Sequence, residues 1–203
     1  MDTSFLGRVW AWVKWPLLVL VIAYAVLVGF RTKYLLDQDK TAEAVAKIHA
    51  SKLTREDVFG ALPPEPDPVA NNATLAGVDV NNNGIRDDVE RAIYEANKDS
   101  VQVAAAEFQY AKTQQMFLTN VYNTETWVAV AEEDSRASYC VSLTYPRDNL
   151  KKFNQVINER LDEVEALVFN TQARKDARDK VYEFATGYTL GGGNLQTCDV
   201  SVN

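Results

Sequence analysis

A run of almost wholly apolar residues near the N-terminus, residues 9–30, constrains this chain more than any other feature of its sequence. Only Lys14 and Pro16 interrupt the run. A helix of that length would extend about 33 Å, enough for the roughly 30 Å hydrocarbon core of a bilayer. Tryptophans cluster at its start, and their amphipathic rings favour the headgroup level. The run therefore predicts a single transmembrane helix.

Two other interpretations of this run remain open. A cleaved signal peptide is one, since Ala23-Tyr24-Ala25 has the small-residue spacing of a cleavage site. The apolar residues continue to Phe30, however, whereas a removed signal normally leads into a polar mature terminus. A type IV pilin is the other, but no Gly-Phe junction is followed by Glu at the fifth mature position. We expect an uncleaved anchor.

Composition and charge limit what the rest of the chain can do. With 203 residues, of which 47% are hydrophobic and 24% charged, the chain is long enough for one folded domain with appendages. The net charge of -7 argues against a nucleic-acid partner, which requires a concentrated basic face. Cys140 and Cys198 lie outside any Cys-x-x-Cys spacing, so they indicate neither a zinc site nor a redox pair. We predict a Cys140–Cys198 disulfide.

The chain divides by composition into three parts. Residues 1–34 form a cytoplasmic stub and the transmembrane anchor, and residues 35–68 form a juxtamembrane helix followed by a Pro-rich linker. Residues 69–203 form a helical domain. The prolines of residues 62–68 cannot continue a helix, because each one removes a backbone donor. They are typical of a semi-rigid spacer. Before them, Thr54 is expected to cap a short helical turn that ends at Gly60.

A twelve-residue segment at the start of the domain, residues 79–90, has the composition of a cation-binding loop. Oxygen-bearing side chains occupy its first, third, fifth, ninth and twelfth positions, and Gly84 stands where the backbone must reverse. Hard divalent cations take six to eight oxygens, which one short loop supplies only if alternate side chains turn inward. The candidate ligands are Asp79, Asn81, Asn83, the carbonyl of Ile85, Asp87 through a water, and Glu90 with two carboxylate oxygens.

This segment resembles the calcium loop of EF-hand proteins, in the variant that dockerins and thrombospondin-type repeats carry. The resemblance covers residues 79–90 only, and it implies a single unpaired Ca²⁺ site. Arg86 departs from the family pattern, which usually has Ile at the eighth position, and the preceding segment is Pro-rich instead of helical. Asn at positions 81 and 83 reduces the negative charge, so we expect a dissociation constant on the order of 10⁻⁴–10⁻³ M. The alternative is an Asx-rich turn without a metal ion.

Helical signals dominate the remainder, and no strand alternation of useful length occurs, so the predicted fold class is all-α. Helices are expected from residue 87, over residues 101–118, and from Thr124 or Thr126 to Cys140. A long amphipathic helix follows over residues 150–168, with a further helix or a continuation bent near residues 170–171. The stripe that faces the core is Leu150, Phe153, Ile157, Leu161, Val164 and Val168. The glycines at 191–193 are expected to form a turn that returns Cys198 to Cys140.

No catalytic residue can be assigned from the sequence. His49, the single histidine, is expected on a solvated helix face. The adjacent acids Glu132, Glu133 and Asp134 are expected on another solvated face, because an acid–base pair needs a cleft and opposed environments. No nucleophile lies near a base and no cofactor fingerprint is present, so an enzyme is the less favoured class.

The combined features predict a location and a class of function. Loop charges on the two sides of the anchor are similar, so we place the domain by its chemistry: weak calcium affinity and disulfides are both useful outside the cytoplasm. We expect a single-pass protein of the inner (cytoplasmic) membrane with its C-terminal domain in the periplasm or extracellular space.

Its expected role is structural or interactive, with the lipid bilayer and an envelope protein or a homo-oligomer as partners and no nucleic acid. The candidate contact aromatics are Tyr110, Tyr122, Trp127 and Tyr145. The alternative is an envelope enzyme or small-ligand binder with an interhelical acidic pocket. A calcium sensor ranks last, since sensors use paired loops and Met-rich grooves.

Overall fold

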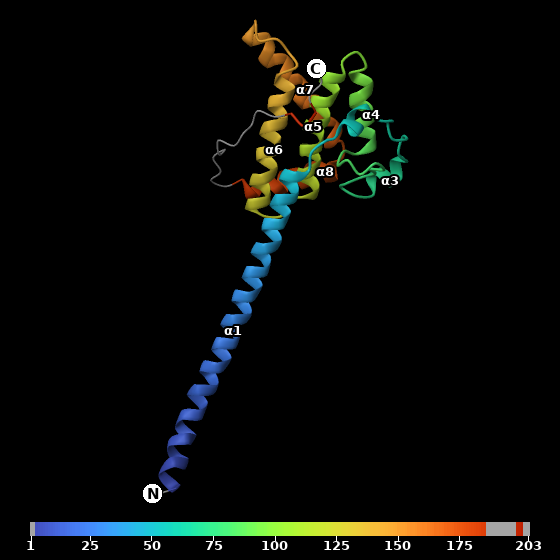
Figure 1. Ribbon diagram of the computed structural model, residues 1–203. Helices are drawn as coiled ribbons and strands as arrows, with labels where there is room; N and C mark the ends of the chain where they lie inside the picture. The colour runs from blue at the N-terminus through green and yellow to red at the C-terminus, as the bar shows by residue number, and fades with distance from the viewer. Residues whose placement is uncertain (1–2, 186–197, 201–203) are drawn as a thin grey trace. The chain divides into compact units, whose positions relative to one another are not determined.

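The computed structural model describes residues 3–185 and 198–200 (Figure 1). All regular elements of these residues are helical, as the sequence predicts. The elements are α1 (Thr3–Ala50), α2 (Arg55–Phe59), α3 (Pro68–Asn72), α4 (Asp87–Ala96), α5 (Val101–Thr119), α6 (Thr124–Ser142), α7 (Leu150–Val168), α8 (Gln172–Val181) and the 3₁₀ turn η1 (Tyr182–Phe184).

The chain forms two compact units, Met1–Glu43 and Ala44–Asn203. The boundary lies inside α1, which is continuous from Thr3 to Ala50, so the expected segment 35–68 is divided between the two units. In the first unit, the large apolar side chains of residues 17–30 are exposed. Within the described part of the chain, α1 is the helix long and apolar enough to cross a membrane, although a signal sequence passes the same test.

In the second unit, α5 is the helix on which the others pack. It contacts α2, α4, α6, α7 and α8, and Figure 1 shows it, in green, among them. Its small residues, such as Ala104 and Ala111, are buried and allow neighbouring backbones to approach closely. Its buried positions also include the polar residues Glu107, Gln109 and Lys112. A helix that is buried nearly all round and carries charges must place those charges opposite partners or in pockets.

The helix starts follow local capping signals. Thr54 and Asp57 form a reciprocal capping box at the start of α2, whose C-cap is Gly60, as predicted. Asn123 caps α6 and Thr171 caps α8, each by accepting a hydrogen bond from the backbone N–H three residues later. The prolines of residues 62–67 do interrupt helix, but Pro68 begins α3 because a proline is tolerated in the first turn.

The predicted core stripe is confirmed in part. Ile157, Val164 and Val168 of α7 are buried, whereas Leu150 is 68% exposed at the helix start. α7 ends at Val168 and α8 begins at Gln172, so the predicted break near residues 170–171 is also confirmed. On α8 the buried side chain is not apolar: it is Arg174, which is 1% exposed.

The predicted disulfide joins Cys140 of α6 to Cys198, with an S–S distance of 2.08 Å and a Cα–Cα distance of 5.6 Å. The next residue, Asp199, pairs with Arg136 at 2.7 Å and accepts a hydrogen bond from the backbone N–H of Leu53 at 2.9 Å. Its own backbone N–H donates to Gln109. The disulfide therefore holds Asp199 at a position where it contacts α5, α6 and the segment that follows α1. The glycine turn predicted at 191–193 lies outside the described residues.

Candidate functional site

The backbone of the predicted calcium loop reverses where the sequence places Gly84. Gly84 has φ of +89°, a conformation that a residue without Cβ adopts at little cost. The carboxylate of Asp79 accepts hydrogen bonds from the backbone N–H groups of Asn83 at 3.2 Å and Gly84 at 2.9 Å. The side-chain oxygen of Asn83 accepts from the N–H of Ile85 at 2.8 Å. These hydrogen bonds hold residues 79–85 in a tight turn that begins at Asp79, the first predicted ligand.

Two carboxylates are buried where this loop meets α4. Glu90 is 2% exposed and accepts from the amide nitrogens of Asn81 at 3.2 Å and Asn83 at 3.1 Å. Asp87 is fully buried; its Oδ1 accepts from the N–H of Val80 at 3.1 Å, and its Oδ2 has no hydrogen-bond partner. Desolvation raises the pKa of Glu90 to about 7, and repulsion from Asp87 and Asp79 adds to it. Burial is also the main cause that raises the pKa of Asp87.

The predicted ligand residues thus share one loop, but they do not form a complete coordination shell. Among the described residues, no group of three or more His, Cys, Asp or Glu side chains is placed to hold a metal ion. Asn81 and Asn83 direct their amide nitrogens toward Glu90, so the carboxylate of Glu90 accepts hydrogen bonds from these two side chains. The residue types fit Ca²⁺, because the unpaired oxygen of Asp87 and the buried carboxylate of Glu90 lack a compensating positive charge.

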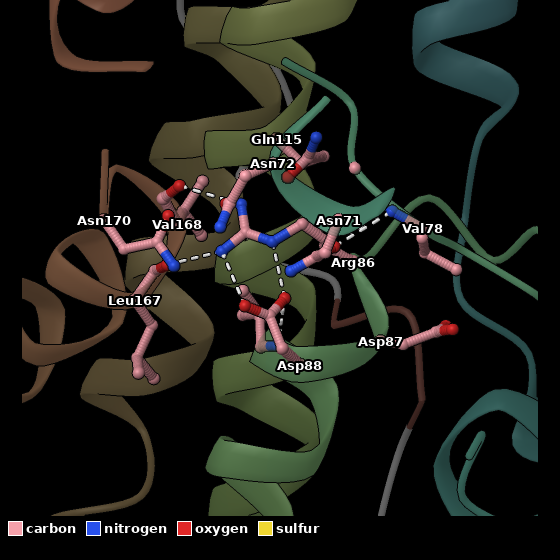
Figure 2. Close-up of polar contacts among 12 residues, drawn as sticks. Asn71, Asn72, Val78, Arg86, Asp87, Asp88, Gln115, Leu167, Val168 and Asn170 are labelled. Atoms are coloured by element: carbon pink, nitrogen blue, oxygen red, sulfur yellow. Dashed lines mark hydrogen bonds and ion pairs between the residues drawn. The ribbon is translucent and has the colours of Figure 1, made fainter. Parts of the chain in front are cut away.

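Arg86, which departs from the EF-hand pattern, has a structural role that explains the departure. Its side chain is fully buried, and its Nε donates to Asp88 at 2.5 Å. The remaining guanidinium nitrogens donate to the carbonyls of Val168 at 3.0 Å and Leu167 at 2.8 Å, at the C-terminus of α7. Figure 2 shows this contact, with Asp87 pointing away from Arg86. Arg86 therefore joins the loop to α7 and satisfies carbonyls that the helix end leaves unpaired.

A second buried arginine organises the segment before the loop. Arg174 donates to the carbonyls of Asn71 at 2.6 Å and Thr74 at 3.2 Å, and to the side chain of Asn72 at 3.0 Å. Asn71 in turn accepts from the N–H of Val78 at 3.0 Å. Burial lowers the pKa of Arg174, with Arg86 as the next cause. Arg174 of α8 thus holds both the short helix α3 and the residues that lead from it into the loop.

The structure corrects the expectation of a solvated face at Glu133 and Asp134, whereas the side chains of His49 and Glu132 are 39% and 36% exposed. Glu133 is 6% exposed, and it accepts from His49 at 2.9 Å, Lys52 at 2.5 Å and Arg136 at 2.6 Å. Desolvation, the largest effect, raises the pKa of Glu133, but the hydrogen bonds from Lys52, His49 and Arg136 outweigh it and hold the pKa below its usual value. The expectation is wrong at Glu133 because this residue faces the last turn of α1 and the segment after it, which lie about 80 residues away in sequence.

Asp134 points to a different interface, between α6 and α5. It is partly buried and accepts from Gln114 at 2.5 Å and Thr113 at 3.2 Å. Desolvation raises the pKa of Asp134 to about 7, and Glu165 of α7 adds to the shift. Glu165 itself accepts from the hydroxyl of Tyr110 at 2.7 Å. Two acids in unlike environments thus lie among α5, α6 and α7, which no periodicity in the sequence indicated.

Of the aromatics predicted to contact a partner, Tyr110 and Trp127 are buried, Tyr145 is partly buried, and Tyr122 is 53% exposed. Only Tyr122 among these four keeps the exposure that a contact residue needs.

Comparison of the chain with protein-family models, with curated proteins and with solved structures finds no match.

Proposed function

We propose that this protein is a membrane-anchored, extracytoplasmic helical domain that binds Ca²⁺ and acts as a structural or interaction protein of the cell envelope. The observation that carries the proposal is the fully buried carboxylate of Asp87, one oxygen of which has no hydrogen-bond partner, beside the buried Glu90. Burying carboxylates without compensation is costly, and a hard divalent cation is the partner that carboxylate and amide oxygens suit best.

The residues that would hold Ca²⁺ are those predicted from the sequence. Asp79 and Glu90 supply carboxylate oxygens, Asp87 acts through a water, Asn81 and Asn83 supply amide oxygens, and Ile85 supplies its carbonyl. The ion would neutralise negative charge where α4 begins, and so stabilise the turn that leads into the bundle. Because Asn81 and Asn83 now donate to Glu90, binding requires their amide groups to turn so that oxygen replaces nitrogen.

The proposed location follows from two features. α1 is long and apolar enough to anchor the chain as a single span, with the lipid bilayer as its partner. The Cys140–Cys198 disulfide favours a compartment where disulfides persist. We place the domain outside the cytoplasm, in the periplasm or extracellular space, and the anchor in the inner membrane. An envelope protein or a second copy of the chain is the proposed partner, and exposed Tyr122 is the candidate contact.

A second function, a small-ligand binder or enzyme with an interhelical acidic pocket, is favoured by Asp134 and Glu165. Burial raises the pKa of Asp134 to about 7, and a carboxyl with a raised pKa can act as a general acid near neutral pH. Asp134→Asn separates the two functions: loss of turnover of an envelope substrate would favour the enzyme, whereas calcium binding and partner capture would be unchanged in a structural protein.

Calcium binding is tested with the full-length protein in nonionic detergent. Thermal unfolding is compared in calcium and in chelator at matched ionic strength, with calcium at one to ten times its dissociation constant. Mass action then gives about 0.4–1.4 kcal/mol of stabilisation, or roughly 1–5 °C in melting temperature. Glu90→Gln should abolish the difference, and Glu163→Gln, an exposed acid of α7, should retain it. An identical melting temperature with and without calcium, together with no uptake of radioactive calcium in flow dialysis, would refute the site.

The interaction role is tested by crosslinking in intact membranes, with a photoreactive residue in place of Tyr122. Capture of one defined envelope protein or of a second copy is expected, and Glu90→Gln should weaken it. A photoreactive residue in place of exposed Lys175 serves as the control. A domain that crosslinks to nothing from either position would contradict the role.

A further inference from the structure

A polar cavity of about 350 Å³ lies beside the calcium loop and is not used by the proposed function. It lies between the segment after α1, the loop and α5. Its polar lining includes Ser51, Lys52, Thr54, Asp57, Asn82 and Lys112. This volume is at the lower end of the range of small-molecule sites. The residues that line it come from segments far apart in sequence, so the cavity exists only in the folded domain.

Lys112 is the unusual member of this lining. Its side chain is 5% exposed, and within the described part of the chain its ammonium has no hydrogen-bond or ion-pair partner. The stem packs over Gly84, where an added Cβ would lie 3.2 Å from Lys112 Cε. The other lysine of the cavity, Lys52, is already bound to Glu133 at 2.5 Å. Lys112 is therefore the cation that is open to a ligand.

The electrostatic surroundings of Lys112 indicate which ligand it lacks. Burial lowers the pKa of Lys112, and the more distant charges of Asp199, Asp57 and Asp79 offset this only in part. A buried ammonium without a partner is destabilising, and an oxyanion at hydrogen-bond distance would compensate it. Asp57, whose carboxylate accepts from the backbone and hydroxyl of Thr54 at 2.7 and 2.8 Å, adds one negative charge to the wall. That charge disfavours a ligand with two negative charges.

We propose that this cavity binds a small molecule through a singly charged oxyanion, most simply a carboxylate, which pairs with the ammonium of Lys112. The hydroxyl of Ser51 and the amide of Asn82 line the same cavity and supply neutral hydrogen-bond donors. Asp57 sets the charge limit, so a carboxylate binds better than a phosphate dianion. The site does not require Ca²⁺, although Asn82, Asn83 and Gly84 of the calcium loop form part of its wall.

The test uses the full-length protein in nonionic detergent and calcium-depleted buffer at pH 8, with chloride replaced by acetate or by inorganic phosphate at constant ionic strength. Acetate should raise the melting temperature and give saturable heat in titration calorimetry, and phosphate should bind more weakly. Lys112→Met, which keeps the length of the side chain, should lower acetate affinity at least about tenfold, the loss expected for one charge-assisted hydrogen bond.

Two further variants make the outcome decisive. Lys175→Met, an exposed lysine of α8, should bind acetate as the wild type does. Asp57→Asn should strengthen phosphate binding more than acetate binding. Equal acetate affinity in the wild type and Lys112→Met, or no response of the wild type to either anion, would overturn the proposal. If Lys112→Met fails to fold, the Asp57→Asn variant provides the test. A phosphate affinity of Asp57→Asn equal to that of the wild type would then overturn the proposal. Because calcium is absent throughout, failure of the calcium site leaves this result unaffected.

Discussion

Asp134→Asn should stabilise the domain at pH 8 and have little effect at pH 4. Desolvation raises the pKa of Asp134 from 3.8 to about 7 in the folded protein. A carboxyl whose folded-state pKa is raised binds its proton more tightly when folded, so stability falls as pH rises from the unfolded pKa toward the folded pKa. Asn resembles the protonated form and can still accept from Gln114 and Thr113 through its oxygen.

The magnitude follows from the size of the pKa shift. About three pKa units correspond to about 4 kcal/mol at 1.36 kcal/mol per unit. Asp134 is only partly buried, so water relaxes part of this cost and about 2–4 kcal/mol is expected. At roughly 2–4 °C per kcal/mol for a chain of this size, Asp134→Asn should melt about 4–16 °C higher than the wild type at pH 8.

The assay is thermal unfolding of the full-length protein by circular dichroism at intervals between pH 4 and pH 8. The difference between variant and wild type should grow through this window and level off above pH 7. Asp162 is an exposed acid of α7, and Asp162→Asn should show no such trend. A variant that is less stable than the wild type at pH 8, or a difference independent of pH, would refute the reasoning.

Two further predictions concern stability. Replacing Cys140 and Cys198 together by Ala should destabilise the domain by about 4 kcal/mol, because the crosslink spans 58 residues and constrains the unfolded chain. Equal melting temperatures for this variant and the wild type, or free thiols in the native protein, would contradict this prediction. Gly77→Ala should cost about 2–4 kcal/mol, because φ is +71° and the new Cβ would lie 2.2 Å from the Cδ of buried Arg86. Gly29→Ala, where a Cβ meets nothing within 4 Å, is the control, and equal losses in urea unfolding would refute the steric argument.

The sequence predicted the elements whose signals are local. The capped turn at Thr54 follows from its side chain, and the disulfide follows from an even cysteine count. The start of α6 was predicted at Thr124 or Thr126, and the residue that caps it is Asn123. The turn at Gly84 follows from the motif. These features depend on a few neighbouring residues, so a single sequence suffices to find them.

The features that were missed depend on distant neighbours. Glu133 and Asp134 are adjacent in sequence, yet Glu133 faces Lys52, His49 and Arg136, and Asp134 faces α5 and an acid of α7. From the sequence, Arg174 looks like a surface residue of a polar helix. It is buried because residues 71–75, about 100 residues away in sequence, pack against it and accept its hydrogen bonds. The candidate ligand residues share one loop because the motif is local, but the amide orientation at Asn81 and Asn83 depends on Glu90 and could not be predicted from spacing.

The Cys140–Cys198 bond also determines how the chain responds to proteolysis. A protease that cuts once anywhere between residues 140 and 198 yields two pieces that remain one covalent molecule until the bond is reduced. Asp199 would then stay beside Arg136 and the N–H of Leu53, because its neighbour remains attached to α6. A nicked domain would therefore keep these contacts, and the nick would be visible only on a reducing gel.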